Sequence, residues 1–349
     1  FGTMDGSVSA LQPDGSQAPG FPVYTWKLKD IDPRNPQNFD SEAYSSVQAL
    51  RDARDPISGI AVGDLDGNGA QSIVATTTSG WVYVWNSSGK LREGFPVHGD
   101  DQYNTLPVPT PWSGGYHARS PIRGNWSAPT LGNLQGNGKL SILMSSYDGH
   151  VYAWQPNGDP TPGWPVEVKL PDSIKSTIPA NSYIHDPKLM MAPAVGDVLG
   201  TGTDQVFLPG FDCDDAANKT FAYGIQSDGN NNPGGPYLPG WPIKMGSIGG
   251  CYSQSIDFVQ EGANAASIGD FDNSGQLRIA ITPVAGSPVI VNGDGSLYKG
   301  MTPGCTSAPC SGYDPYYGSD SITVGVTSQS AIGDLTGDGM PEFMQPTAG

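Results

Sequence analysis

Positive charge is scarce in this sequence. It holds 17 Lys and Arg residues against 34 Asp and Glu residues, so its formal net charge is −17 at pH 7. Nucleic-acid binding depends on Lys and Arg side chains that neutralise phosphates. The charge balance therefore argues against a nucleic-acid partner, and it suits a protein that carries bound cations.

Long hydrophobic runs are absent as well. No apolar stretch approaches the ~20 residues that a membrane-crossing helix needs, so no membrane span is expected within this chain. No signal peptide is visible, but the sequence begins at Phe1 in the middle of a repeat unit. The missing signal therefore says nothing about where the protein works.

Recognisable catalytic signatures are also missing. The four histidines form no H-x-x-x-H or HExxH pair, and there is no G-x-S-x-G motif, phosphate-binding loop or dinucleotide-binding fingerprint. Paired acids for glycoside hydrolysis would have to lie among the many Asp residues, and the sequence does not place two at the required separation. No catalytic residue is predicted, and an enzyme is the less favoured class.

What the sequence does have is glycine, proline and aromatic residues. Its 48 Gly and 32 Pro exceed average usage, yet 8 Trp, 15 Tyr and 10 Phe are too many for a disordered chain. Frequent turns combined with many aromatic residues indicate numerous short strands. The composition favours an all-β fold.

An internal repeat organises the chain. In residues 60–97, IAVGDLDGNGAQSIVATTTSGWVYVWNSSGKLREGFPV, an apolar run, an Asp/Asn/Gly loop, two strand-like runs and a Gly-aromatic-Pro turn follow one another. The loop returns at Asp64, Asn133, Asp197, Asp270 and Asp334, in steps of 69, 64, 73 and 64 residues. The turn begins at Gly20, Gly94, Gly163 and Gly240. Such repetition is typical of solenoids, propellers and arrays.

Each unit is predicted to hold four strands, A to D. Strand A precedes the loop, as at Ser127–Leu131, and strand B follows it, as at Ser141–Ser145. Strand C alternates Val82 and Val84 with aromatic residues, so both of its faces are apolar, as in a sheet packed between two others. Because proline cannot donate to a ladder, strand D, which holds the Gly-Phe/Trp-Pro-Val turn, should be the outer edge.

Four-stranded antiparallel units with both faces buried describe the blades of a β-propeller. We predict one β-propeller domain over residues 1–349, with about five units, begun and ended in mid-blade. The five units could close as they stand, or they could be part of a seven-bladed ring in a longer chain. Long insertions are predicted at about 24–56, 98–126, 168–190, 208–222, 245–264 and 301–328.

Strand alternation predicts where the loops and insertions lie. The B–C and D–A connections share one end of a blade, which we call the insertion face, and the Asp-rich A–B loops lie at the opposite end. The four cysteines contain no CxxC pair, so disulfides in an oxidising compartment are favoured over a zinc site. All four fall in insertions of one face. The pairing that needs least movement is Cys213–Cys251 with Cys305–Cys310.

The A–B loops carry oxygen ligands at every second residue. Asp64-Leu65-Asp66-Gly67-Asn68-Gly69 brings carboxylate and amide oxygens together at a sharp turn, which suits a hard cation. With these loops, the units resemble the FG-GAP and VCBS repeats of integrin-α-like β-propellers and their bacterial relatives, over nearly all of the chain except the insertions. In that family a D-x-[DN]-x-D-G-x-x-D loop binds Ca²⁺ through side chains at positions 1, 3, 5 and 9 and the carbonyl at position 7. The resemblance implies Ca²⁺ as cofactor.

Carried over residue by residue, the family pattern fits two loops best. The first offers Asp64, Asp66 and Asn68, with Ser72 where the family has an acid, and the last offers Asp334, Thr336, Asp338 and Glu342. Asp270, Asp272 and Ser274 keep three oxygens in a third loop, but Arg278 replaces the acid and would repel a cation. The Asn133 and Asp197 loops are better explained as plain turns.

Partner recognition is the leading functional hypothesis. The insertions are rich in Tyr and Trp, which could anchor a protein or a sugar ring or could pack the insertions onto the propeller. Three sequons, at Asn86, Asn125 and Asn218, are candidate glycosylation sites, although chance also produces such triplets. We predict a Ca²⁺-stabilised propeller, extracellular or on the cell surface, that binds a protein or carbohydrate ligand in adhesion or recognition. Alternatives are an extracellular polysaccharide-acting enzyme and a self-assembling subunit of a surface appendage or filament.

Overall fold

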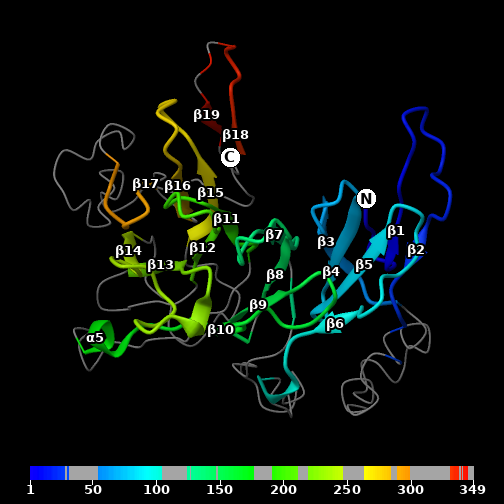
Figure 1. Ribbon diagram of the computed structural model, residues 1–349, viewed down its shortest axis with the longest axis horizontal. Coiled ribbons are helices and arrows are strands. Elements are labelled where there is room, and N and C mark those ends of the chain that lie inside the picture. The colour runs from blue at the N-terminus through cyan, green and yellow to red at the C-terminus, as the bar shows by residue number, and fades with distance from the viewer. Residues whose placement is uncertain are drawn as a thin grey trace, which may run out of the picture. The chain divides into compact units, whose positions relative to one another are not determined.

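The computed structural model describes residues 1–27, 30, 54–103, 124–125, 127–146, 148–176, 191–210, 219–246, 263–283, 289–298, 331–337, 339 and 341–344. The chain divides into two compact units, and each is considered by itself. The first comprises residues 1–131, 138–148 and 152–161, and the second comprises residues 132–137, 149–151 and 162–349. Figure 1 shows strands throughout the described residues and very little helix.

Three sheets have four antiparallel strands each, in the order of the sequence. The first contains β3 (Ile57–Gly63), β4 (Ser72–Thr77), β5 (Trp81–Asn86) and β6 (Val97–His98). The second contains β7 (Thr130–Gly132), β8 (Ser141–Ser145), β9 (His150–Trp154) and β10 (Val166–Glu167). The third contains β11 (Ala194–Gly196), β12 (Gln205–Pro209), β13 (Lys219–Ile225) and β14 (Ile243–Gly246).

Three smaller sheets hold parts of the same pattern. Strands β1 (Ser7–Val8) and β2 (Val23–Tyr24) correspond to strands C and D, and β18 (Ala331–Gly333) and β19 (Glu342–Met344) to strands A and B. Strands β15 (Ala263–Gly269), β16 (Arg278–Pro283) and β17 (Val289–Val291) form a three-stranded sheet. The short helices with given bounds in the described residues are α5 (Asp172–Lys175), η1 (Asp101–Tyr103) and η2 (Gly229–Asn231).

This order confirms the predicted fold class. The protein is all-β, and its four-stranded antiparallel sheets have the strand order of β-propeller blades, with strand D at the edge of each complete sheet. The predicted insertion 208–222 is shorter than expected, because β12 runs to Pro209 and β13 begins at Lys219. Likewise β14 and β15 extend into the two ends of the predicted insertion 245–264.

Strand β5 is buried on both faces, as its sequence predicts. Trp81, Tyr83 and Trp85 lie in a cluster with side chains of the β1–β2 sheet. Val82 and Val84, on the opposite face, are fully buried in a different cluster that includes side chains of β8. A central blade strand therefore contributes to two hydrophobic cores at once.

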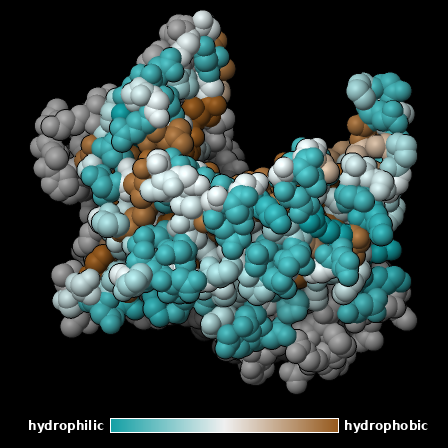
Figure 2. Space-filling view, viewed as in Figure 1, coloured by the Kyte–Doolittle hydropathy of each residue, from teal (hydrophilic) through white to brown (hydrophobic). Residues whose placement is uncertain are grey.

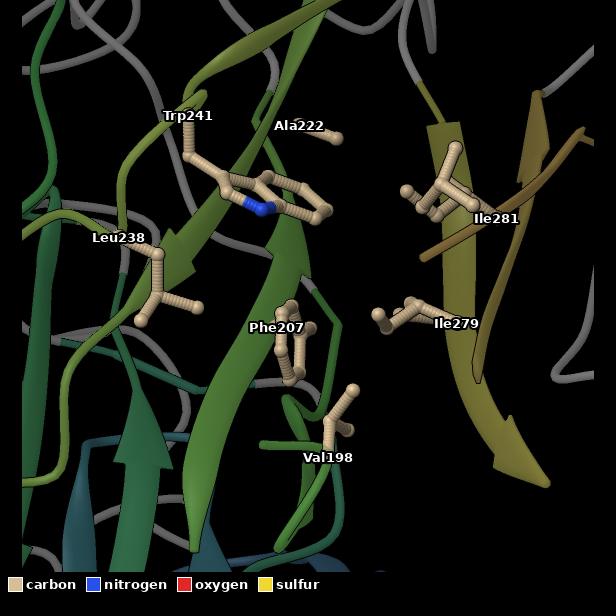
Figure 3. Packing of buried hydrophobic residues seen from close by; sticks show 9 residues of the cluster. Val198, Phe207, Ala222, Leu238, Trp241, Ile279 and Ile281 are labelled. Carbon is tan, nitrogen blue, oxygen red and sulfur yellow. The ribbon is translucent and has the colours of Figure 1, made fainter. Parts of the chain in front are cut away.

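The second compact unit repeats this arrangement. Figure 3 shows Phe207 and Trp241, from one sheet, facing Ile279 and Ile281 of β16 in the next. The ring centroids of Phe207 and Trp241 are 5.3 Å apart, and neither isoleucine is more than 1% exposed. Sheet-on-sheet packing of apolar side chains thus joins the blades.

A repeated backbone contact also joins successive blades. Gly163, in the Gly-aromatic-Pro turn, has φ +86°, and a Cβ there would collide with the carbonyl oxygen of Asp228 in the C–D hairpin of the next sheet. We call this contact between turn and hairpin the turn clasp. It recurs between Gly20 and Ser88, Gly94 and Asn157, and Gly240 and Asp294. In two clasps the indole N–H also donates to the hairpin, from Trp164 to the Ser227 carbonyl (3.1 Å) and from Trp241 to the Gly293 carbonyl (2.9 Å).

The surface agrees with the composition. Hydrophilic residues dominate the face seen in Figure 2, and apolar residues show there only in small groups. Within the described residues, every helix is too short and too polar to cross a membrane.

Candidate functional site

The A–B loops share one hydrogen-bond scheme. The first-position carboxylate of each acidic loop accepts backbone N–H groups from the end of the loop: Asp64 from Asn68 (3.1 Å) and Gly69 (2.5 Å). Asp197, Asp270 and Asp334 accept two such bonds each, from Thr201 and Gly202, from Ser274 and Gly275, and from Gly337 and Gly339. These bonds close each loop around its first-position acid.

The Asp64 loop retains part of a cation-binding set. Asp64 is half-buried, and the hydrogen bond from the Gly69 N–H lowers its pKa, so it stays ionised. Asp66, at position 3, accepts a 2.8 Å hydrogen bond from Arg92, which lowers the pKa of Asp66. Ser72, at position 9, is buried and brings no charge. A Ca²⁺ ion fits this loop only in competition with Arg92.

The Asp334 loop is described in part. Its first acid accepts the N–H groups of Gly337 at 2.6 Å and Gly339 at 2.8 Å. Asp338 and the side chain of Glu342 lie outside the described residues. Across the part of the chain that is described, no three His, Cys, Asp or Glu side chains cluster as metal ligands. A cation at the Asp64 loop, whose residues are all described, would therefore need Asn or Ser side chains and backbone carbonyls as well.

The Asp270 loop does not fit a cation. Arg278 lies with its Nη1 2.6 Å from Asp272 Oδ1, and the Tyr298 hydroxyl donates to Asp272 Oδ2 at 2.7 Å. Hydrogen bonds from Ser274, Tyr298 and Arg278 hold the pKa of Asp272 well below its usual range. A guanidinium already neutralises the carboxylate that would bind the metal.

The two loops expected to be plain turns have uncharged side chains at loop positions 3 and 9. In the Asp197 loop, Gln205 occupies position 9, accepts the N–H of Leu199 at 3.0 Å and donates to the Thr203 carbonyl at 2.6 Å. In the Asn133 loop, the side chain at position 3 is Gln135, an amide without charge. Amide hydrogen bonds can close such loops without metal.

Arg92 and Tyr298 are the contacts that sequence reasoning missed. Each lies between strands C and D. Arg92 follows Leu91, which forms a β-bridge with Trp85, and Tyr298 follows Leu297, which forms one with Val291. Each donates to the position-3 acid of its own A–B loop. Where position 3 is not an acid, the equivalent residues are Thr161 and Leu238. Comparing these positions across the repeat would have provided the missing signal.

Asp55 is a buried acid that the sequence did not single out. Its side chain is fully buried, and Oδ1 accepts the Ser79 N–H at 3.3 Å, while Oδ2 has no hydrogen-bond partner among the described residues. Burial raises the pKa of Asp55 to about 6. Its backbone N–H donates to the Trp26 carbonyl, and its carbonyl accepts the Thr25 hydroxyl. Asp55 therefore links the β1–β2 sheet to the β3–β6 sheet.

Beside Asp55 lies an exposed aromatic patch, which we define as Tyr24, Trp26 and Arg54. Tyr24 and Trp26 are 48% and 44% exposed, and the Arg54 guanidinium lies 4.7 Å from the centre of the Tyr24 ring. The Trp26 backbone is held by the Tyr83 hydroxyl, to which its N–H donates at 3.1 Å. The patch lies at the two ends of the first predicted insertion. Its aromatic rings are exposed, and the bond to Tyr83 fixes the Trp26 backbone.

The modification sites stand as follows. Asn86 is exposed at the end of β5 and remains a predicted glycosylation site. Asn125 is fully buried, and its Oδ1 accepts the Ser127 N–H, so the folded chain offers no room for a glycan there. Asn218 and all four cysteines, Cys213, Cys251, Cys305 and Cys310, lie outside the described residues, and their disulfides stay predictions.

Two of the four histidines lie in the described residues, and Nδ1 of His98 is 3.8 Å from Asp101 Oδ1. His150 is buried in β9, and His98 lies 4.3 Å from Trp81, ring centre to ring centre. The remaining two, His117 and His185, lie outside the described residues.

No protein-family model matches the chain, and no curated protein matches it. Among solved structures, BamB from Moraxella catarrhalis is 14% identical, with a TM-score of 0.38 over 70% of this chain and 53% of its own. The Dos1 propeller is 9% identical, with a TM-score of 0.37 over 72% and 48%. BBS1N, solved in complex with ARL6DN, is 9% identical, with a TM-score of 0.35 over 69% and 54%. The chain spans about half the length of these structures.

The class of the protein, all-β with propeller-type blades, rests on the strand order of its own sheets. The FG-GAP resemblance has no family match behind it and stays a prediction.

Proposed function

We propose that this protein is a recognition module of the extracellular space or cell surface, which binds a protein partner through its insertion face and is stabilised by Ca²⁺. The observation that carries the binding role is the exposed and fixed patch of Tyr24, Trp26 and Arg54. Fold alone does not define function, so the argument rests on this patch.

The patch has the chemistry of a binding anchor. Tyr, Trp and Arg are the residue types that dominate binding energy at protein interfaces. The 5.8 Å separation of the Trp26 and Trp81 ring centres, with the backbone bond to Tyr83, limits how far Trp26 can move. An anchor that is already ordered loses little entropy on binding. A protein partner is favoured because two exposed aromatic rings beside a guanidinium combine the residue types that anchor protein interfaces.

Position on the blade supports the same role. In each complete sheet the antiparallel order puts the D–A and B–C connections at one end. Tyr24 is the last residue of strand D of the first sheet, Trp26 follows that strand, and Arg54 precedes strand A of the next. The patch therefore lies at the start and end of a D–A insertion, on the insertion face.

Ca²⁺ belongs to the opposite end of the blades. In this proposal Asp64, Asp66 and Asn68 hold one ion, and the Asp334 loop, with Thr336, Asp338 and Glu342, holds another. The ion would supply positive charge that draws the acids together and stiffens the A–B loop. The acidic balance of the chain and the two acids of the first loop, Asp64 and Asp66, support this assignment.

Partner capture with variants of the patch tests the binding role. Surface proteins of cells that carry this protein are captured on the full chain, on Trp26→Ala and on Leu199→Ala. Leu199 is 47% exposed in an A–B loop and serves as the matched control. We expect Trp26→Ala to lose at least ~10-fold in affinity for the captured partner and Leu199→Ala to keep it.

Other outcomes would correct the proposal. Binding on a glycan array that Trp26→Ala abolishes would make the ligand a carbohydrate. Concentration-dependent light scattering that Trp26→Ala abolishes would make it a second copy of this chain. Equal capture by all three proteins would contradict a role for the patch. Labelling of intact cells by an impermeant reagent tests the location.

A further inference from the structure

We propose that the Arg278 side chain takes the place of the cation in the loop from Asp270 to Arg278, so that this loop is closed by an internal guanidinium and needs no metal. The inference does not depend on Ca²⁺ binding elsewhere in the chain.

The position of Arg278 carries the argument. Its Nη1 lies 2.6 Å from Asp272 Oδ1, 4.0 Å from Asp270 Oδ1 and 3.2 Å from the carbonyl oxygen of Gln276. These atoms belong to loop positions 3, 1 and 7, which are positions where the resembled repeats place ligands of their ion. One guanidinium nitrogen thus donates to two of the oxygens that a bound cation would gather and lies within ion-pair distance of a third.

The surroundings hold the guanidinium in place. The Arg278 side chain is only 7% exposed. Its Cζ lies 4.0 Å from the centre of the Tyr298 ring, at cation–π distance. The Tyr298 hydroxyl donates to the second oxygen of Asp272, so one tyrosine supports both partners of the ion pair. A planar, permanently charged group suits a site where a carboxylate and a carbonyl converge.

The other loops show that this is particular to one repeat. Position 9 is Ser72, Ser141 and Gln205 in the preceding loops, and all three are buried without charge. Arg92, the cation near the Asp64 loop, comes from the approach to strand D and contacts the position-3 acid from outside the loop. Only Arg278 contacts positions 1, 3 and 7 among the described loops.

A double-mutant cycle tests the internal cation. Arg278→Met, Asp272→Asn and their combination are made in the full chain, and thermal unfolding is followed in chelator. We expect Arg278→Met to lower the Tm by about 5 °C, because it leaves the acids of the loop without a counter-charge. The same substitution in the Asp272→Asn background should cost clearly less. Lys90→Met, which removes one exposed positive charge, is the control and should change little. Strictly additive losses would overturn the proposal.

Metal binding provides the second test. With Asp64→Asn and Asp334→Asn both introduced, we expect neither Ca²⁺ stabilisation nor Tb³⁺ luminescence excited through Tyr298. A Tb³⁺ signal in that protein, abolished by Asp272→Asn, would show that the loop holds metal despite Arg278 and would overturn the proposal. Should the wild-type chain show no response to Ca²⁺ at all, the Ca²⁺ part of the proposed function fails, while the cycle above still decides the role of Arg278.

Discussion

The indole nitrogen of Trp241 lies 2.9 Å from the carbonyl oxygen of Gly293, in the hairpin of the following sheet. This single bond shows how the repeat is held together: the outer turn of one blade is tied to the outer hairpin of the next. Because both partners are buried, breaking the bond leaves an unpaired carbonyl in the interior.

Trp241→Phe should therefore destabilise the protein. The substitution removes the N–H donor and part of a buried ring, and we expect a loss of about 2 kcal/mol in the free energy of unfolding. Urea denaturation followed by fluorescence measures it. Trp26→Phe, at a side chain 44% exposed, should cost less than half as much. Equal losses for the two would contradict a stabilising role for the clasp bond.

Gly163→Ala tests the close approach of the backbone in the clasp. Gly163 has φ +86° and would place a Cβ against the Asp228 carbonyl, whereas Gly200, at φ +67°, has open space around it. Both substitutions incur the strain of a left-handed conformation, about 1 kcal/mol, but only Gly163→Ala adds the collision. We expect its loss to exceed that of Gly200→Ala by about 2 kcal/mol or more in urea denaturation. Similar losses for Gly163→Ala and Gly200→Ala would mean that the Asp228 hairpin moves aside without a measurable cost in stability.

Asp55 predicts an unusual dependence of stability on pH. Burial raises its folded-state pKa to about 6 from the ordinary aspartate value of 3.8. Between those values the folded chain keeps the proton while the unfolded chain releases it, so stability is greatest at low pH and falls as the pH rises through 6. Relative to Asp55→Asn, the wild type should lose about 3 kcal/mol between about pH 4 and pH 7.

The measurement is urea denaturation of both proteins across that pH range. The groups near Asp55 with their own charge or titration are Arg54, which is permanently charged, and Tyr83, whose pKa burial raises further above neutrality. Neither titrates in this window. Asp14→Asn is the control of opposite sign, because the Ser16 hydroxyl lowers the pKa of exposed Asp14. If the difference in unfolding free energy between wild type and Asp55→Asn did not change with pH, the raised pKa of Asp55 would be contradicted.

Chelation should lower the melting temperature if Ca²⁺ binds as proposed. A ligand held only by the folded state stabilises it in proportion to the logarithm of its concentration, and we expect a fall of about 3 °C or more in excess chelator. Asp64→Ala combined with Asp334→Ala should abolish the response. Asp197→Ala removes the same loop-closing carboxylate from a loop whose position-3 and position-9 side chains are uncharged. It should therefore lower the melting temperature yet keep the Ca²⁺ response. A melting temperature that does not change in excess chelator would contradict the Ca²⁺ proposal.

Strand positions could be predicted because each repeat copy repeats the same local chemistry. The predicted strand Ser141–Ser145 is β8, with the same bounds, and alternation of aliphatic and aromatic residues predicted that β5 is buried on both faces. Strand A was less accurate: Ser127–Leu131 was predicted and β7 spans Thr130–Gly132. Its early residues are held instead by side chains, since the Thr76 hydroxyl donates to the Ser127 carbonyl.

The candidate sites were predictable only in part. Ligand spacing showed where oxygens gather, and the charge of Arg278 showed that one loop differs. The spacing could not show that Arg92 reaches Asp66, because the two lie 26 residues apart and meet only when strand D folds back along the sheet. Asp55 was missed for the same reason, since its burial depends on Thr25 and Trp26 of another sheet.

The turn clasp has a consequence for how such a chain can change over evolutionary time. Each repeat copy supplies the turn of one clasp and the hairpin of another. The copy that contains Asn157 and Gly163, for example, offers its hairpin to Gly94 and its turn to Asp228. A duplicated copy would therefore arrive with both halves of the joint already encoded, and a deleted copy would leave two matching halves behind. Copy number can then rise or fall through recombination without new interface residues, while the insertions diverge independently.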